Sequence, residues 1–171
     1  MTWEGGIQYD GDIFRASQVL MNLTTFYPGA ECYEVAGFFW WQGDRDSRDA
    51  GLSSQYEKHL VSLIKALRAE FKVPKAPFVT ASLGQSAIGA TDGGGKILEA
   101  MLNVGCNGQT NGATTKCKYP EFKDNVATVY THPLENTPGS SGGHYGDDAI
   151  TYMNVGMAMG AEMAKMKQQQ Q

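Results

Sequence analysis

The stretch YEVAGFFWW, Tyr33 to Trp41, is an apolar run rich in aromatic residues that ends abruptly at Gln42. Runs of this kind are typical of strands that are buried on both faces of a parallel sheet. The residues that follow, Gln42 to Asp46, are polar apart from one glycine. Because α/β proteins place binding and catalytic groups at the carboxyl ends of parallel strands, we expect a functional site at this end.

Helical and strand patterns alternate along the rest of the chain. The clearest helix is Ser54–Phe71, whose apolar stripe runs from Tyr56 to Phe71 while Lys65 and Arg68 lie off it. The other expected elements are a helix over Asp12–Phe26 with Asp12 as its N-cap, strands over Ala76–Leu83 and Asn125–His132, and helices over Lys96–Val104 and from Asp147 or Asp148 to about Lys165. The alternation predicts an α/β fold with a parallel sheet, in a single domain over residues 1–171.

Composition and charge exclude several classes of protein. Lys plus Arg number 14 and Asp plus Glu number 18, giving a net charge of -4. This balance argues against a nucleic-acid partner, which requires clustered positive charge. No apolar run approaches the roughly 20 residues that would span a bilayer. Residues 1–12, MTWEGGIQYDGD, lack the basic and apolar regions of a signal peptide.

A nucleotide cofactor is not expected, although TDGGGK, residues 91–96, precedes a helix. A phosphate-binding P-loop requires a further glycine where Ala90 stands and a Ser or Thr where Ile97 stands. We therefore expect no cofactor.

The three cysteines are Cys32, Cys106 and Cys117, and an odd number excludes complete pairing within the chain. Cys106 and Cys117 bracket the polar loop CNGQTNGATTKC, and they form either a disulfide in an oxidising compartment or two separate thiols. Together with His132 and His144 they lack the close pair spacing of structural zinc sites, so we expect no metal.

Polar clusters fall at the ends of the expected strands: Gln42–Asp46, Gly84–Ser86 and the loop that ends in Gly142–Tyr145. His144 is the strongest single candidate, because imidazole is the side chain most often used as a general base near neutral pH. His132 and His59 are weaker candidates.

Amide and carboxyl groups dominate the first cluster. A fixed Gln42 amide can stabilise an oxyanion, and one such donor is worth roughly 3 kcal/mol. The alternative is that Gln42 ends the strand by bonding the backbone of its own turn. Asp44 and Asp46, with Arg45 between them, are spaced as carboxylates that orient a histidine or pair with Arg48. The alternative for these acids is a solvated turn with local hydrogen bonds.

Three segments together resemble the SGNH-type carbohydrate acetylesterases, which include the sialate O-acetylesterase domain and carbohydrate esterase family six. They are AGFFWWQGDRDS from Ala36, APFVTASLG from Ala76 and HYGDDAITYMNVGMAMG from His144. The resemblance covers about residues 10–166. It implies a three-layer, flavodoxin-like α/β fold and a serine hydrolase that removes acetyl groups from sugars, with an acetylated carbohydrate as its partner. It also favours an extracellular or periplasmic location.

The resemblance implies a role for each matching residue. Gln42 corresponds to the oxyanion-hole amide, Gly43 lets the backbone approach the substrate, and His144 corresponds to the catalytic base. Asp44 and Asp46 match the acidic positions of the same block.

The sequence departs from the family at the nucleophile. The family's serine lies in a G-Q-S-N-type block after the first strand, and in the family's register this chain begins beyond that block. We therefore expect an N-terminally truncated domain without its nucleophile segment. Ser141 stands where the family has an acid three residues before His144. Gly84-Gln85-Ser86 repeats the GQS chemistry, which makes Ser86 the alternative nucleophile.

Loss of the preceding strands would leave residues 33–41 at an edge of the sheet. An apolar edge strand pairs with another chain. We therefore expect a homo-oligomer or a companion chain that covers the edge. Beside the acetylesterase, the alternatives are a non-catalytic, self-assembling descendant and a glycan-binding module whose cleft is lined by Trp40, Trp41 and Tyr145.

Overall fold

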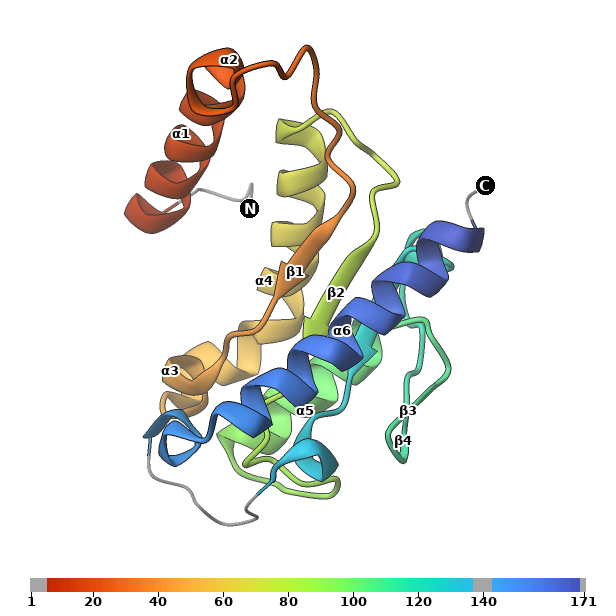
Figure 1. The fold of residues 1–171 in the computed structure, drawn as a ribbon. Coiled ribbons are helices and arrows are strands. Elements are labelled where there is room, and N and C mark those ends of the chain that lie inside the picture. Colours follow the sequence, from red (N-terminus) through yellow and green to blue (C-terminus); the bar gives the residue numbers. More distant parts are fainter. Residues whose placement is uncertain (1–5, 137–142, 170–171) are drawn as a thin grey trace. The chain divides into compact units, whose positions relative to one another are not determined.

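The computed structural model describes residues 6–136 and 143–169 (Figure 1). The chain divides into two compact units, residues 1–36 and residues 37–171, and a single domain over the whole chain stays a prediction. The first unit consists of helices α1 (Ile7–Met21) and α2 (Leu23–Phe26) and the segment that follows them. Within the described ranges, no helix is long and apolar enough to cross a membrane.

The expected helix start at Asp12 is wrong, because α1 begins earlier, after the N-cap residue Gly6. Asp12 lies inside the helix, where its carboxylate pairs with Arg15 one turn later. Pairs three residues apart lie on the same face of a helix and stabilise it slightly. The helix ends where Asn22 donates its side-chain amide to the Gln18 carbonyl at 2.8 Å.

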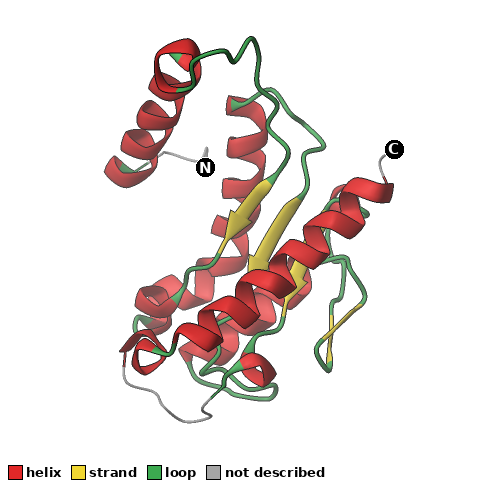
Figure 2. Ribbon diagram, in the orientation of Figure 1, coloured by secondary structure: helices red, strands yellow, loops and turns green. Residues whose placement is uncertain are grey.

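The second unit is built on a parallel sheet of three strands in the order β1-β2-β5 (Figure 2). The strands are β1 (Phe38–Trp40), β2 (Phe78–Ala81) and β5 (Val126–Val129). Helices α4 (Ala50–Glu70) and α5 (Gly93–Val104) pack on one face, and α6 (Ala149–Gln169) covers the other. This is the predicted three-layer α/β arrangement of a flavodoxin-like fold. Short elements connect these layers: α3 (Asp44–Ser47), β3 (Gln109–Thr110), β4 (Ala113–Thr114), η1 (Pro120–Phe122), η2 (His132–Leu134) and η3 (Gly143–Asp147).

Strand β1 is shorter and more exposed than the sequence predicted. Of the stretch 33–41, only Phe38–Trp40 pairs with β2, and β1 lies at an edge of the sheet in the described part of the chain. Phe38 and Trp40 pack against the core beneath α4 and α5, whereas Phe39 is 56% exposed. Burial on both faces is therefore wrong, because α6 covers β2 and β5 and leaves the Phe39 side of β1 open.

Helix α4 confirms its apolar stripe but not the place of Arg68. The Arg68 side chain is buried and donates to the Ala76 carbonyl at 2.7 and 3.0 Å and to the Asn125 carbonyl at 2.9 Å. It thereby links the backbone segments that immediately precede β2 and β5. Burial lowers the pKa of Arg68 to about 10, so the guanidinium remains charged near neutral pH.

Helix α5 begins before its expected start, with Asp92 accepting from the Gly95 amide at 2.8 Å. A Cβ on Gly93 would lie 1.9 Å from the Ser47 carbonyl oxygen, and one on Gly95 would lie 1.9 Å from that of Ala90. The glycine run therefore allows the first turn of α5 to pack directly against neighbouring backbone.

Cys106 and Cys117 form a disulfide, which decides between the alternatives that the sequence left open. Between them, β3 and β4 form an antiparallel hairpin. Its turn residues Asn111 and Gly112 both have positive φ, 46° and 89°. Asn-Gly is the preferred pair for such two-residue hairpin turns.

Arg68→Ala tests the role of this side chain at the strand ends. We expect the free energy of unfolding, measured by urea denaturation, to fall by about 2–5 kcal/mol, because the Ala76 carbonyl loses the Arg68 donor and the Asn125 carbonyl keeps only the Phe78 amide. The matched control is Lys65→Ala on the same helix, whose exposed ion pair with Glu121 is worth about 0–1 kcal/mol. Equal losses in the two variants would contradict this role.

Candidate functional site

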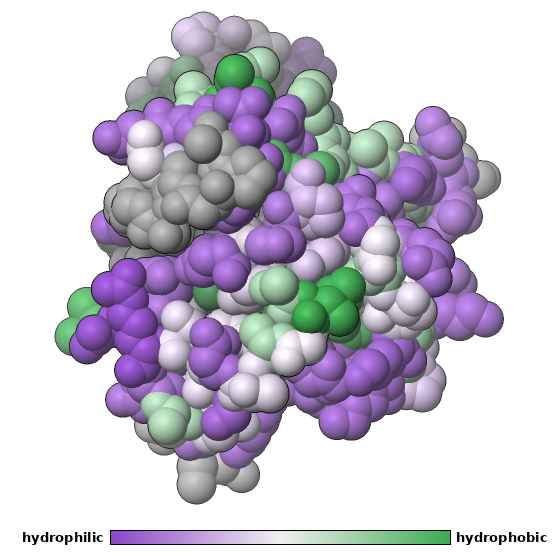
Figure 3. Space-filling model, turned by 90° about the horizontal axis from the view of Figure 1, so that it is seen from below, coloured by the Kyte–Doolittle hydropathy of each residue, from purple (hydrophilic) through white to green (hydrophobic). Residues whose placement is uncertain are grey.

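The carboxyl ends of the three parallel strands bring the polar clusters of the sequence together. Gln42 follows β1, Gly84 follows β2 and His132 follows β5. Figure 3 views the molecule from below, the side on which the strands of Figure 1 end. Hydrophilic residues cover most of this face and surround small hydrophobic areas.

Gln42 is held from both sides by hydrogen bonds. The Tyr56 hydroxyl donates to the Gln42 backbone carbonyl at 2.8 Å, and Gln42 Nε2 donates to Asp46 Oδ2 at 2.5 Å. Burial raises the pKa of Tyr56 far above its ordinary value, so this hydroxyl remains a donor. A primary amide nitrogen carries two hydrogens, of which Asp46 takes one.

Gly43 is required by its backbone conformation. Its φ of 144° lies in the region that favours glycine. A Cβ at this position would also lie 3.1 Å from Ile97 Cγ2. The turn after β1 therefore packs closely against α5, and helix α3 begins directly after Gly43.

Asp44 connects the first cluster to the second. Its carboxylate accepts from Gln85 Nε2 at 3.2 Å and from Arg48 Nη2 at 2.6 Å. Asp46 instead holds Gln42. The two acids therefore have separate partners, and the expected pairing with Arg48 belongs to Asp44.

Ser86 is a buried residue of the segment after β2, with 4% of its surface exposed. A Cβ placed on Gly94 would lie 2.4 Å from Ser86 Oγ, so the hydroxyl faces the first turn of α5. Its role as a nucleophile stays a prediction.

Tyr145 connects the last loop to the first two clusters. Its ring stacks on Trp41 with centroids 5.6 Å apart, and its hydroxyl accepts from the Gly84 amide at 2.9 Å. Tyr152 contacts both rings edge-on, at 5.4 Å from Trp41 and 5.7 Å from Tyr145. Burial raises the pKa of Tyr145, which keeps its hydroxyl protonated. Trp41, Tyr145 and Tyr152 thus form an aromatic cluster that begins at the residue before Gln42.

His144 precedes Tyr145 in η3, and its side chain lies outside the described residues, as do Ser141 and Gly142. The backbone of η3 is nevertheless anchored at the carboxyl end of the sheet through Tyr145. The candidate base and the candidate amide therefore come from segments whose next residues, Tyr145 and Trp41, are in contact.

Sequence reasoning missed Tyr56 and Tyr130 as parts of this site, and it missed the contacts that His132 makes. His132, a weaker candidate, has Nδ1 2.6 Å from the Gly84 carbonyl oxygen, and Tyr130 stacks on its ring. The helical spacing of Tyr56 indicates a core residue, but nothing in that spacing indicates the bond to Gln42. The strand-end positions of Tyr130 and His132 were the available signal.

Gly84→Ala tests the packing of this site. A Cβ there would lie 2.7 Å from Tyr145 Cε1 and 2.6 Å from Glu135 Oε1. We expect a loss of about 1–3 kcal/mol in unfolding free energy from overpacking, with a changed near-ultraviolet circular dichroism of the aromatic stack. Gly156→Ala on α6 is the control, because a Cβ there would meet no atom of the described residues within 4 Å and alanine favours helices by about 0.5–1 kcal/mol. An unchanged spectrum and stability in Gly84→Ala would contradict the described packing.

Comparisons with known proteins place the chain in a family. Residues 2–165 match the family model described as carbohydrate esterase, sialic acid-specific acetylesterase. A search of curated proteins found no match. An X-ray structure of a protein from Arabidopsis thaliana aligns with a TM-score of 0.56 at 19% identity, covering 95% of this chain and 53% of that chain. At this identity the likeness shows the fold, and this chain spans about half the length of that structure.

Proposed function

Because the chain belongs to the carbohydrate esterase family of sialic acid-specific acetylesterases, we propose that its site binds acetyl esters of sugars and supports their hydrolysis. The observation that carries this proposal is the stacking of Tyr145 on Trp41. Tyr145 follows His144 and Trp41 precedes Gln42, so this contact brings the two segments to the same end of the sheet. A base and an oxyanion donor are two of the groups that acyl transfer requires.

Gln42 supplies the oxyanion donor in this proposal. Tyr56 and Asp46 fix its backbone and its amide before any ligand arrives. Preorganised donors of this kind stabilise the developing negative charge without reorganisation during the reaction. Gly43 allows the turn that carries this amide, because a side chain at its φ of 144° would be strained and would lie 3.1 Å from Ile97 Cγ2.

His144 takes the proton from the attacking hydroxyl and returns it to the leaving sugar oxygen. Asp44 and Asp46 shape the first cluster, and Trp41 and Tyr145 offer aromatic surface for a sugar ring. We assign the nucleophilic serine to a segment other than residues 1–171. The support for this assignment is the burial of Ser86, whose hydroxyl faces α5.

Binding of an O-acetylated monosaccharide, measured by titration calorimetry with the full chain, tests this proposal. We expect the acetylated sugar to bind more tightly than its deacetylated form, and Gln42→Ala to weaken binding about tenfold through loss of one hydrogen bond. Gln55→Ala, which changes an exposed glutamine on α4, is the matched control.

Equal affinity for both sugars would contradict the ester site and favour a glycan-binding module. The nucleophile assignment has its own readout in the same samples. We expect the chain alone to hydrolyse p-nitrophenyl acetate at the background rate. A faster rate that disappears in both His144→Ala and Ser86→Ala would overturn the external serine and assign Ser86.

A second candidate function is self-assembly through β1, and we propose a second copy of this chain as the partner. In the described ranges β1 has a strand on one side only, and Phe39 is 56% exposed. On α6, Met153 and Met157 are 64% and 63% exposed. An unpaired strand edge and exposed apolar side chains each favour association.

Phe39→Lys tests this association. We expect sedimentation velocity to show a concentration-dependent oligomer for the wild-type chain and an association at least roughly tenfold weaker for the variant, since a charge on an edge strand opposes pairing. Leu52→Lys changes an exposed apolar residue of α4 and is the control. A monomeric wild-type chain at all concentrations, or equal effects of both changes, would contradict the proposal.

A further inference from the structure

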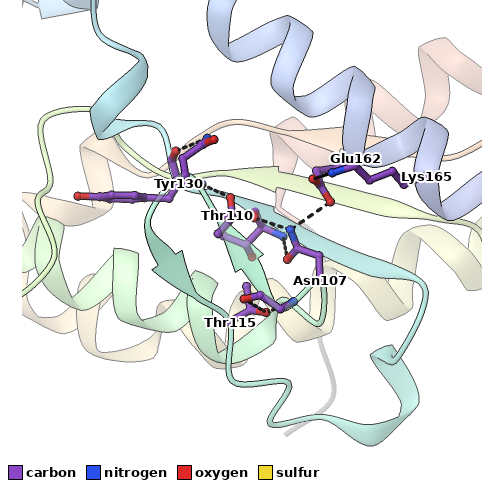
Figure 4. Close-up of polar contacts among 9 residues, drawn as sticks. Asn107, Thr110, Thr115, Tyr130, Glu162 and Lys165 are labelled. Atoms are coloured by element: carbon purple, nitrogen blue, oxygen red, sulfur yellow. Dashed lines mark hydrogen bonds and ion pairs between the residues drawn. The ribbon is translucent and has the colours of Figure 1, made fainter.

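The loop between Cys106 and Cys117 occupies the outer edge of β5 (Figure 4). Asn107 exchanges two hydrogen bonds with Thr128, accepting from its amide and donating to its carbonyl, both at 3.1 Å. The Tyr130 amide donates to Thr110 Oγ1 at 2.9 Å. Side chains of the loop therefore form the hydrogen bonds to the outer backbone groups of β5 that a further strand would otherwise form.

Two more contacts complete this edge. Asn111 donates its side-chain amide to the Tyr130 carbonyl at 2.8 Å, and the Cys106 amide donates to the Val126 carbonyl at 2.8 Å. The Asn107 amide also reaches Glu162 of α6 at 3.2 Å, which is paired in turn with Lys165. The amide and carbonyl of Thr128 and of Tyr130, and the carbonyl of Val126, thus have partners in the loop.

The other end of the loop is bound to the end of α5. The Lys116 amide donates to the Leu102 carbonyl at 2.7 Å, and the Cys117 amide donates to the Gly105 carbonyl at 3.0 Å. Ala113 belongs to the same small apolar cluster as Leu102 and Tyr130. Apart from this cluster the loop is polar, so its order depends on hydrogen bonds and on the disulfide, which limits the freedom of the open chain.

Tyr130 extends this arrangement into the candidate site. Its backbone is held by the loop, and its hydroxyl accepts from the Ile88 amide at 3.1 Å. Ile88 lies in the segment after β2 that begins with Gly84 and contains Ser86. The Tyr130 ring also stacks on His132, whose Nδ1 is 2.6 Å from the Gly84 carbonyl oxygen. One residue therefore contacts both the disulfide loop and the site segment 84–88.

We propose that the Cys106–Cys117 disulfide regulates the order of the site segment 84–88 through Tyr130. A dithiol reductant would transfer two electrons and two protons, so that the S–S bond becomes two thiols while the dithiol becomes a disulfide. The opened loop releases the backbone of Tyr130, and Ile88 loses a fixed acceptor. As a form of regulation, the inference rests on the proposed function, whereas the structural coupling does not.

Amide hydrogen exchange of the full chain, followed by NMR without sugar, tests the coupling. On reduction with dithiothreitol, and in Cys106→Ser/Cys117→Ser, we expect exchange at Thr128, Tyr130 and Ile88 to accelerate roughly tenfold or more. Because strand residues alternate in direction, the amides of Ala127 and Val129 face β2 and are expected to change less than about twofold.

Tyr130→Phe isolates the link to the site, since it removes the hydroxyl and keeps the ring. We expect fast exchange at Ile88 in this variant even with the disulfide intact, and no further change at Ile88 on reduction. Tyr119→Phe is the control, because that hydroxyl donates to Glu57 at 2.7 Å and not to the site segment. Acceleration at Thr128 and Tyr130 with none at Ile88 would overturn the coupling, and so would uniform acceleration that includes Ala127 and Val129.

These outcomes are separable from the ester-binding proposal. If exchange at Ile88 responds but no acetylated sugar binds, the coupling stands and the proposed function fails. If the sugar binds equally well before and after reduction, the regulatory role fails while the proposed function stands.

Discussion

The backbone groups at the ends and edges of a short parallel sheet are the constraint on which this fold depends. Each of its strands has three or four residues, so much of the strand backbone lies at an end or an edge. A buried polar group without a partner costs about 1–3 kcal/mol. Arg68 donates hydrogen bonds to the backbone carbonyls just before β2 and β5. The disulfide loop supplies hydrogen-bond partners along the outer edge of β5. In the described ranges, no strand pairs with the outer edge of β1.

The same demand at the carboxyl ends of the strands builds the candidate site. Ser82 follows β2 and Thr131 follows β5, and a hydrogen bond joins them: the Thr131 hydroxyl donates to the Ser82 carbonyl at 2.7 Å. The Trp41 indole donates to the same carbonyl at 3.1 Å, and the Tyr145 hydroxyl receives the Gly84 amide. Side chains that satisfy strand ends are therefore the ones that surround the candidate site, so we expect substitutions there to lower stability as well as to alter the site.

The sequence predicted what depends on local pattern and missed what depends on distant contacts. The apolar stripe of Ser54–Phe71 and the alternation of strands and helices were sufficient for the fold class and for α4, because burial dictates both. Arg68 was expected off the stripe, since no local pattern shows that a guanidinium will reach two strand ends. The run 33–41 was expected to be a long buried strand, but the apolar character of Phe39 does not show that α6 stops short of it.

The site was predicted to the same extent. Strand ends identified Gln42, Asp44 and the Gly84 segment, and Asp44 does contact Gln85. The spacing of Tyr56 showed a core residue, but its hydroxyl bond to Gln42 depends on how α4 crosses β1. Trp41 and Tyr145 were expected in one cleft, but no local pattern indicated that their rings stack, because they come from segments far apart along the second unit.

An NMR titration of the isotope-labelled chain with an O-acetylated monosaccharide tests whether these strand ends form the proposed acetyl-ester site. We expect the largest shifts to occur together at the Gln42 side-chain amide, the Gly84 backbone amide and the Trp41 indole. Shifts concentrated elsewhere, such as on the β3–β4 hairpin, or no shifts at all, would contradict it.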